Sequence, residues 1–321
     1  MGPSRDRLLR THAIAAVLVL VVAPVPALLA RACNYTWSLL LFLLPSTLIL
    51  GWFLRSKDDA LVSVRRAFLL TLGLLVPMGF VLNFLFAGDF FSYPNSHAVL
   101  GIYLPGLRWR GFDWSLKFPL EELLFYGFGF LSMLLVYLWA DAFFLRREQA
   151  SPGRYREQGS VVQLAVGPGL VALAVVVAGW LFKHFHGGGF PGYLAFLMLV
   201  PFVVALALYR VARALVNWPA FLLMLLYVLG TSVLWEVSLA LPGGWWRYRP
   251  AAMVGLFVAR WSDLPVEAVL VWFLAAFATV VVFEAAKVFV HHPATALGHK
   301  LFASPAALPV PAPGPGEAGG V

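Results

Sequence analysis

Apolar residues run along this chain in long stretches that are separated by short polar segments. Each stretch is about 20 residues long, which is the length that an α-helix needs to cross the hydrocarbon core of a bilayer. The predicted helices are at 11–32, 36–54, 66–88, 118–145, 160–183, 190–212, 218–241 and 264–290. We therefore expect an all-α integral membrane protein with about eight transmembrane helices.

The composition supports this fold class. Hydrophobic residues make up 61% of the 321 residues and charged residues 12%, whereas soluble domains have about 45–50% and about 25%. The net charge of +8 could indicate nucleic acid, but basic residues also flank membrane helices on the cytoplasmic side. Most of the 23 Lys and Arg residues lie on one side of the predicted helices. We expect a protein of the bacterial cytoplasmic membrane with both termini cytoplasmic and no nucleic-acid partner.

Two of the predicted helices begin with the same short pattern. One begins with Pro119, Glu121 and Glu122, and the other with Pro265 and Glu267. Pro is common in the first turn of a helix, and the helix dipole favours Glu there, so an ordinary helix start explains the residue types. However, ionisable groups at the mouth of a membrane helix are costly and usually functional. These carboxylates are therefore candidate site residues.

A long aromatic loop precedes each of these helix starts, the first at 89–117 and the second at 242–263. Phe91-Ser92-Tyr93 and Gly101 in the first loop correspond to Trp246-Arg247-Tyr248 and Gly255 in the second. We therefore predict an internal duplication into two parallel four-helix repeats. The predicted segments are a first repeat at 1–147, a polar linker at 148–159, a second repeat at 160–291 and a disordered Pro/Ala/Gly-rich tail at 292–321. Parallel repeats place both helix starts on one membrane face, where they can form one site.

The chemistry of this site follows from its residue types. A carboxyl group in a medium of low dielectric constant can act as a Brønsted acid near neutral pH. Aromatic faces stabilise positive charge. Together they suit protonation of an alkene and cyclisation through a carbocation, with a substrate dissolved in membrane lipid. The chain has a single cysteine and no nucleotide-binding or HExxH pattern, so we predict neither a metal site nor a cofactor.

The pattern Pro119-Leu120-Glu121-Glu122-x-x-Phe125 and its echo Pro265-Val266-Glu267 resemble the integral-membrane lycopene cyclase domain. This family comprises the two-subunit bacterial cyclases and the cyclase half of fungal bifunctional carotenoid enzymes. The resemblance covers 66–145 and 218–290. It implies a cofactor-independent isomerase of carotenoid biosynthesis that converts the linear ends of lycopene into rings. Ala268 stands where the second Glu of the pattern is expected. This departure favours a structural role for one half and leaves open whether the second repeat is catalytic.

Roles follow for individual residues. We expect Glu121 or Glu122 to be the general acid, with Glu236 and Glu267 as the corresponding groups of the second copy. The residues expected to line the substrate site are Phe125, Trp114, Tyr93, Trp245, Trp246 and Tyr248. Those expected to start the helices or to organise the loops are Pro119, Pro265, Asp89 and Asp113.

Three other functions stay open at this point. A carotenoid hydratase would use the same acid chemistry. A retinal- or carotenoid-binding protein would use Lys287 as a Schiff-base lysine, and a transporter would use the parallel repeats. The oligomeric state is also open, including a homo-oligomer or an association with other carotenoid enzymes.

Overall fold

The computed structural model describes residues 35–39, 59–106, 117–143, 166–212 and 215–291. These residues are mostly helical, and six of their helical stretches are long and apolar enough to span a membrane. The stretches are α4 (Asp59–Phe90), α5 (Glu121–Phe143), α7 (Val166–His186), α8 (Gly192–Leu197) continued by the π-helix η2 (Met198–Phe202) and α9 (Val203–Ala212), α10 (Trp218–Trp235) continued by the π-helix η3 (Glu236–Ala240), and α11 (Val266–His291). The predicted helix at 11–32 and most of that at 36–54 lie outside the described residues, as do the linker and the tail.

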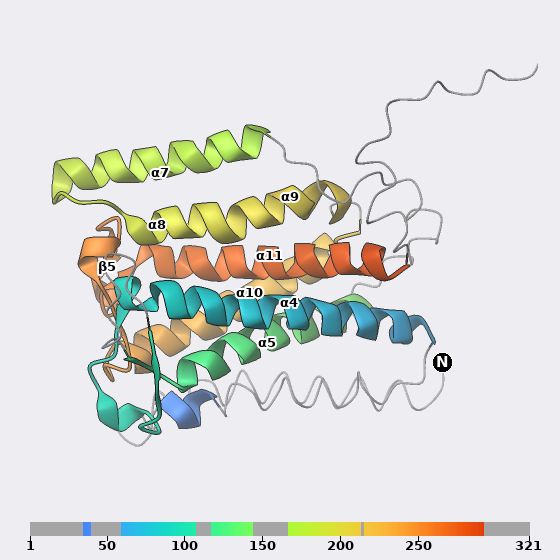
Figure 1. Ribbon diagram of the computed structural model, residues 1–321, viewed down its shortest axis with the longest axis horizontal. Coiled ribbons are helices and arrows are strands. Elements are labelled where there is room, and N and C mark those ends of the chain that lie inside the picture. The colour runs from blue at the N-terminus through green and yellow to red at the C-terminus, as the bar shows by residue number, and fades with distance from the viewer. Residues whose placement is uncertain (1–34, 40–58, 107–116, 144–165, 213–214, 292–321) are drawn as a thin grey trace, which may run out of the picture.

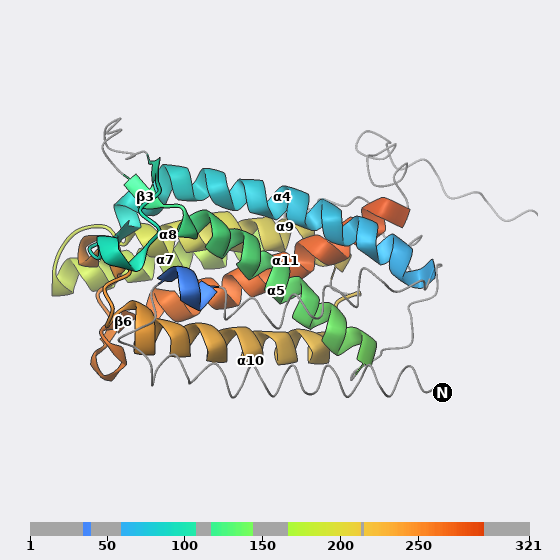
Figure 2. The same cartoon turned by 90° about the horizontal axis from the view of Figure 1, so that it is seen from below.

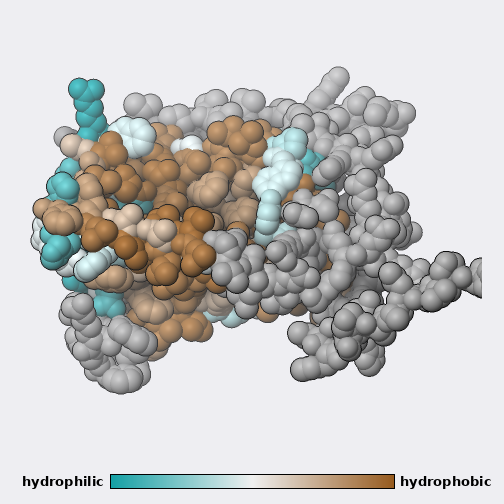
Figure 3. Space-filling view, turned by 90° about the horizontal axis from the view of Figure 1, so that it is seen from above, coloured by the Kyte–Doolittle hydropathy of each residue, from teal (hydrophilic) through white to brown (hydrophobic). Residues whose placement is uncertain are grey.

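The helices lie side by side along the long axis of the molecule (Figures 1 and 2). The central helix is α11, which packs against α4, α9 and α10, and α5 packs against α4 and α10. Helix α7 lies on the outside of α8 and α9 (Figure 1), and its Leu170, Val171 and Leu173 are exposed. On the face seen in Figure 3, the coloured middle of the bundle is hydrophobic and one end is more polar. Such an apolar belt fits a bilayer.

The loops that follow α4 and α10 meet at one end of the bundle (Figures 1 and 2). They contain three antiparallel pairs of short strands, which join β1 to β4, β2 to β3 and β5 to β6. The strands are β1 (Phe91–Ser92), β2 (Tyr103–Pro105), β3 (Lys117–Pro119), β4 (Arg247–Tyr248), β5 (Phe257–Val258) and β6 (Leu264–Pro265). The 3₁₀-helices are η1 (Ser96–Ala98), η4 (Pro250–Ala252) and η5 (Ala259–Trp261). The pair β1–β4 joins the two aromatic loops directly.

The two proline residues have a different position from the one predicted. Pro119 is the last residue of β3, and α5 begins two residues later. Pro265 is likewise the last residue of β6, immediately before α11. Proline has no N–H to donate to a ladder, so each strand ends at its proline. The N–H of the next residue then donates back to the partner segment, from Leu120 to the carbonyl of Ile102 at 2.9 Å and from Val266 to that of Leu256 at 3.1 Å.

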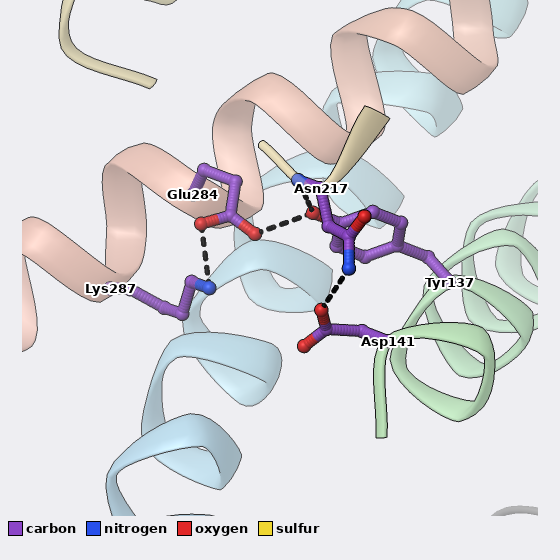
Figure 4. Close-up of polar contacts among 5 residues, drawn as sticks. All are labelled: Tyr137, Asp141, Asn217, Glu284 and Lys287. Atoms are coloured by element: carbon purple, nitrogen blue, oxygen red, sulfur yellow. Dashed lines mark hydrogen bonds and ion pairs between the residues drawn. The ribbon is translucent and has the colours of Figure 1, made fainter. Parts of the chain in front are cut away.

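A polar cluster joins three helices at the other end of the bundle (Figure 4). The Lys287 ammonium lies 2.6 Å from the carboxylate of fully buried Glu284. The Tyr137 hydroxyl donates to the other Glu284 oxygen at 2.8 Å and accepts from the Asn217 N–H at 3.0 Å. The Asn217 side chain donates to Asp141 at 2.7 Å. These contacts fix the end of α5 and the start of α10 against α11.

Replacing Lys287 with Met is expected to destabilise the protein by on the order of 2–4 kcal/mol, since it leaves the Glu284 charge buried without its cation. Thermal or denaturant unfolding in detergent micelles measures the change. The double variant with Glu284→Gln should recover part of the loss, because it removes the uncompensated charge. Equal stability of the wild type and Lys287→Met would show that the pair does not stabilise the fold.

Candidate functional site

Two carboxylates from opposite halves of the chain line one cavity beneath the loops. Glu122 comes from the first turn of α5, and Glu236 comes from the π-helix that follows α10. Both are buried, with exposed fractions of 8% and 3%. The cavity measures about 690 Å³ with its open mouth included. We call it the acid cavity.

Aromatic side chains form most of the wall of the acid cavity. They are Tyr35, Phe91, Tyr93, Phe125, Tyr126, Phe130, Tyr193, Trp246, Tyr248 and Trp272. They come from both aromatic loops, from α5, α8 and α11, and from the helical turn at 35–39. Several are in contact with one another; for example, the ring centroids of Phe125 and Trp272 are 5.4 Å apart in an edge-to-face arrangement. A cation that forms in this cavity would face aromatic rings on several sides.

Two tyrosines surround Glu122. The Tyr35 hydroxyl donates to Oε1 of Glu122 at 2.8 Å. Tyr93 lies in the loop above, and burial, followed by the nearby Glu122 carboxyl, raises the pKa of its hydroxyl well above the ordinary value. The Tyr93 hydroxyl therefore stays protonated, and the hydrogen bond to Glu122 comes from Tyr35. The Oε2 atom of Glu122 is the position at which a transferable proton could be held.

Glu236 accepts a hydrogen bond on each oxygen. The Tyr248 hydroxyl donates to Oε2 at 2.9 Å, and the Trp272 indole N–H donates to Oε1 at 3.2 Å. The indole can only donate, so the Oε1 atom of Glu236 is the acceptor in this contact. Burial and then Glu236 raise the pKa of the Tyr248 hydroxyl, which keeps this donor protonated as well.

Glu121 and Glu267 make a different kind of contact. Oε1 of Glu121 accepts from the Leu100 N–H at 2.7 Å and from the Thr36 hydroxyl at 2.6 Å. Oε1 of Glu267 accepts from the Val254 N–H at 2.5 Å. Both residues are fully buried, and neither is among the residues that line the acid cavity. Each holds the aromatic loop that precedes its own helix.

Lys183 holds the second aromatic loop through hydrogen bonds to three of its backbone carbonyls. Its ammonium donates to the carbonyls of Pro250 at 3.0 Å and Ala251 at 2.7 Å, and also to that of Met253. The side chain is buried at the end of α7. It therefore fixes the loop segment that continues to Val254, the hydrogen-bond donor to Glu267.

The other predicted site residues are placed as follows. Phe125, Tyr93, Trp246 and Tyr248 are in the wall of the acid cavity. Trp245 lies behind this wall and stacks on Tyr35, with ring centroids 5.8 Å apart. Asp89 is in the last turn of α4, away from the cavity wall. Asp113 and Trp114 lie outside the described residues.

Sequence reasoning missed several residues of the cavity, above all Tyr35 and Trp272. Tyr35 is 87 positions from Glu122, and no spacing in the sequence connects them. Trp272 could have been found, because it lies on the same helix as Glu267, slightly more than one turn later. The face of α5 that borders the cavity also has a readable helical spacing, with Glu122, Phe125, Tyr126, Gly129, Phe130 and Met133.

Comparison with protein-family models, with curated proteins and with solved structures finds no match for this chain. We therefore infer the chemistry of the site from its own residues and their geometry. The site combines two buried carboxyl groups that accept hydrogen bonds with a mostly aromatic wall in an apolar bundle. Among the described residues, no three His, Cys, Asp or Glu side chains are grouped as metal ligands.

Proposed function

We propose that this protein is a lycopene cyclase-like membrane enzyme of carotenoid biosynthesis, which isomerises the linear end groups of a polyene by acid catalysis. The observation that carries the proposal is the position of Glu122 and Glu236 on one cavity with a mostly aromatic wall. An acid, a base and cation-stabilising rings are the groups that such a reaction requires. The substrate would enter from membrane lipid.

The proposed reaction begins when Glu122 donates its proton to the terminal double bond of the substrate. The resulting tertiary carbocation is attacked by a second double bond of the same chain, which closes a six-membered ring and moves the positive charge onto the ring. Glu236 then removes a proton next to the cationic carbon, and a ring double bond forms. One proton enters and one leaves, so there is no net oxidation or reduction, and no cofactor is required.

The proposed internal duplication accounts for the paired contacts of the loops. Glu121 and Glu267 each accept a backbone N–H from their own loop, and the residue before each of these glutamates donates to that loop. Gly101 and Gly255 follow these contacts, with positive φ angles of 80° and 106°. On this proposal Glu122 has its counterpart in Ala268, so one acid site serves both repeats. Glu121 and Glu267 are positioning residues, and the catalytic role first expected for them stays a prediction.

Expression in a lycopene-accumulating bacterium tests the proposal. We expect loss of lycopene and the appearance of a product with one or two rings in the membrane pigments. A hydroxylated linear product would support the hydratase instead, because water would then capture the cation. Unchanged lycopene, with the protein present in the inner membrane, would contradict both. Lys287 is paired with Glu284 and does not line the acid cavity, so the structure adds nothing in favour of a retinal protein.

A further inference from the structure

A second cavity lies between α4 and α11 and borders the acid cavity. The two share six lining residues, which are Phe91, Tyr126, Phe130, Tyr193, Val271 and Ala275. The second cavity measures about 820 Å³ with its open mouth included, and we call it the α4–α11 cavity. A long molecule with one end at Glu122 and Glu236 could therefore extend into it.

The α4–α11 cavity is apolar except at a few positions, and one of these is Asn83. This side chain is 2% exposed, and neither its oxygen nor its nitrogen has a hydrogen-bond partner among the described residues. A side-chain amide can donate two hydrogen bonds and accept two, and buried polar groups without partners are costly. A hydrocarbon in the cavity would leave Asn83 unpaired, whereas a hydroxyl or carbonyl oxygen would pair with it.

A third cavity, between α5 and α10, also borders the acid cavity, through Phe125, Gly129, Met133 and Trp272. We call it the α5–α10 cavity. Its Thr231 hydroxyl donates to the backbone of its own helix, to the carbonyl of Tyr227 at 2.8 Å. This hydroxyl therefore has a partner already. Asn83 is what distinguishes the α4–α11 cavity as a place for an oxygen-bearing ligand.

Building on the acid chemistry proposed above, we propose that the α4–α11 cavity binds the unreacted part of the substrate, and that this part carries a hydroxyl or carbonyl oxygen hydrogen-bonded to Asn83. The substrate class is then a linear isoprenoid polyene with an oxygenated position. One end lies between Glu122 and Glu236, and the rest of the chain runs along α4 and α11. Asn83 is the residue that selects the oxygenated chain over the hydrocarbon.

Binding to the purified full-length protein tests the proposal without requiring turnover. The probes are lycopene and an acyclic derivative whose hydroxyl group lies about 12 Å from one end, which is the helical rise from Asn83 in α4 to Phe91 just after it, at 1.5 Å per residue. Quenching of the protein's Trp fluorescence by the polyene reports binding. The wild type should bind the hydroxylated probe about tenfold more tightly, which is the effect of one net hydrogen bond. Asn83→Leu should remove this difference. Equal binding of both probes by the wild type, or an unchanged preference in Asn83→Leu, would overturn the role of Asn83.

A matched pair of cavity-filling variants tests where the chain lies. Ala278 lines the α4–α11 cavity and Ser132 lines the α5–α10 cavity, and each stands eleven residues after the first Glu of its helix. Ala278→Phe should weaken binding of both probes by at least about tenfold through steric exclusion, whereas Ser132→Phe should not. The reverse result, or no effect of Ala278→Phe in a folded protein, would place the chain elsewhere.

Failure of the acid chemistry would give a different result. Glu122→Gln should keep the preference for the hydroxylated probe, which depends on Asn83, and convert neither probe. If the wild type shows the Asn83-dependent preference but never converts a probe, the result would support the proposed binding site and contradict the catalytic proposal. If the wild type converts both probes with equal affinity, the catalytic proposal stands and the role of Asn83 fails.

Discussion

Glu122→Gln is expected to lower turnover by about 10²–10⁴-fold, the usual contribution of a general acid. Glutamine has nearly the same shape and can still accept the hydrogen bond from Tyr35, so the cavity should keep its form. It has no transferable proton, however, and the first step of the proposed reaction needs one at this position. Pigment analysis after expression, normalised to the amount of protein in the membrane, measures the loss.

Glu121→Gln is the matched control for Glu122→Gln. It makes the same chemical change at the adjacent residue, and the new amide oxygen can still accept from the Leu100 N–H. Because Glu121 does not line the acid cavity, its variant should retain most of the turnover. Full activity of Glu122→Gln with loss of activity in Glu121→Gln would reverse the two roles.

Glu236→Gln is expected to lower formation of the ring product by a similar factor, since a glutamine cannot remove the final proton. The cation would then persist until water captures it, so hydroxylated products should form a larger share of the total. Chromatography of the pigments resolves ring and hydroxylated products in one experiment.

The control for Glu236→Gln is Tyr248→Phe, which removes one donor to Glu236 but leaves the carboxylate in place. We expect a decrease of about tenfold, in line with the loss of one hydrogen bond to a charged group, without a change in the product pattern. A Glu236→Gln enzyme with normal rate and normal products would show that another group acts as the base.

The sequence predicted the helices well because their signal is local. The stretch expected at 218–241 is α10 with its π-helical extension, and that expected at 264–290 is α11. Both are long apolar runs that need no information from the rest of the chain. The short strands were not predicted, because β1 and β4 have two residues each and exist only through pairing with each other.

The site was predictable only in part, for the same reason. The helix starts identified Glu121 and Glu122 together, since both fit the dipole and both belong to the family-like pattern. Two hydrogen bonds decide which of the two carboxylates faces the cavity. The Leu100 N–H donates to Glu121, and the Tyr35 hydroxyl donates to Glu122. These partners come from segments that are distant in sequence, so residue spacing could not separate the two carboxylates.

The pairing of β1 with β4 has a consequence for how the protein is made. Phe91 lies opposite Tyr248, and Arg249 donates from its N–H to the carbonyl of Phe90, so a contact across more than 150 residues closes the cavity. Contacts of such long range form late in folding. During synthesis, Glu122 is made before Glu236 and most of the aromatic residues of the cavity wall. The cavity is therefore complete only after the second loop has been made and has paired with the first.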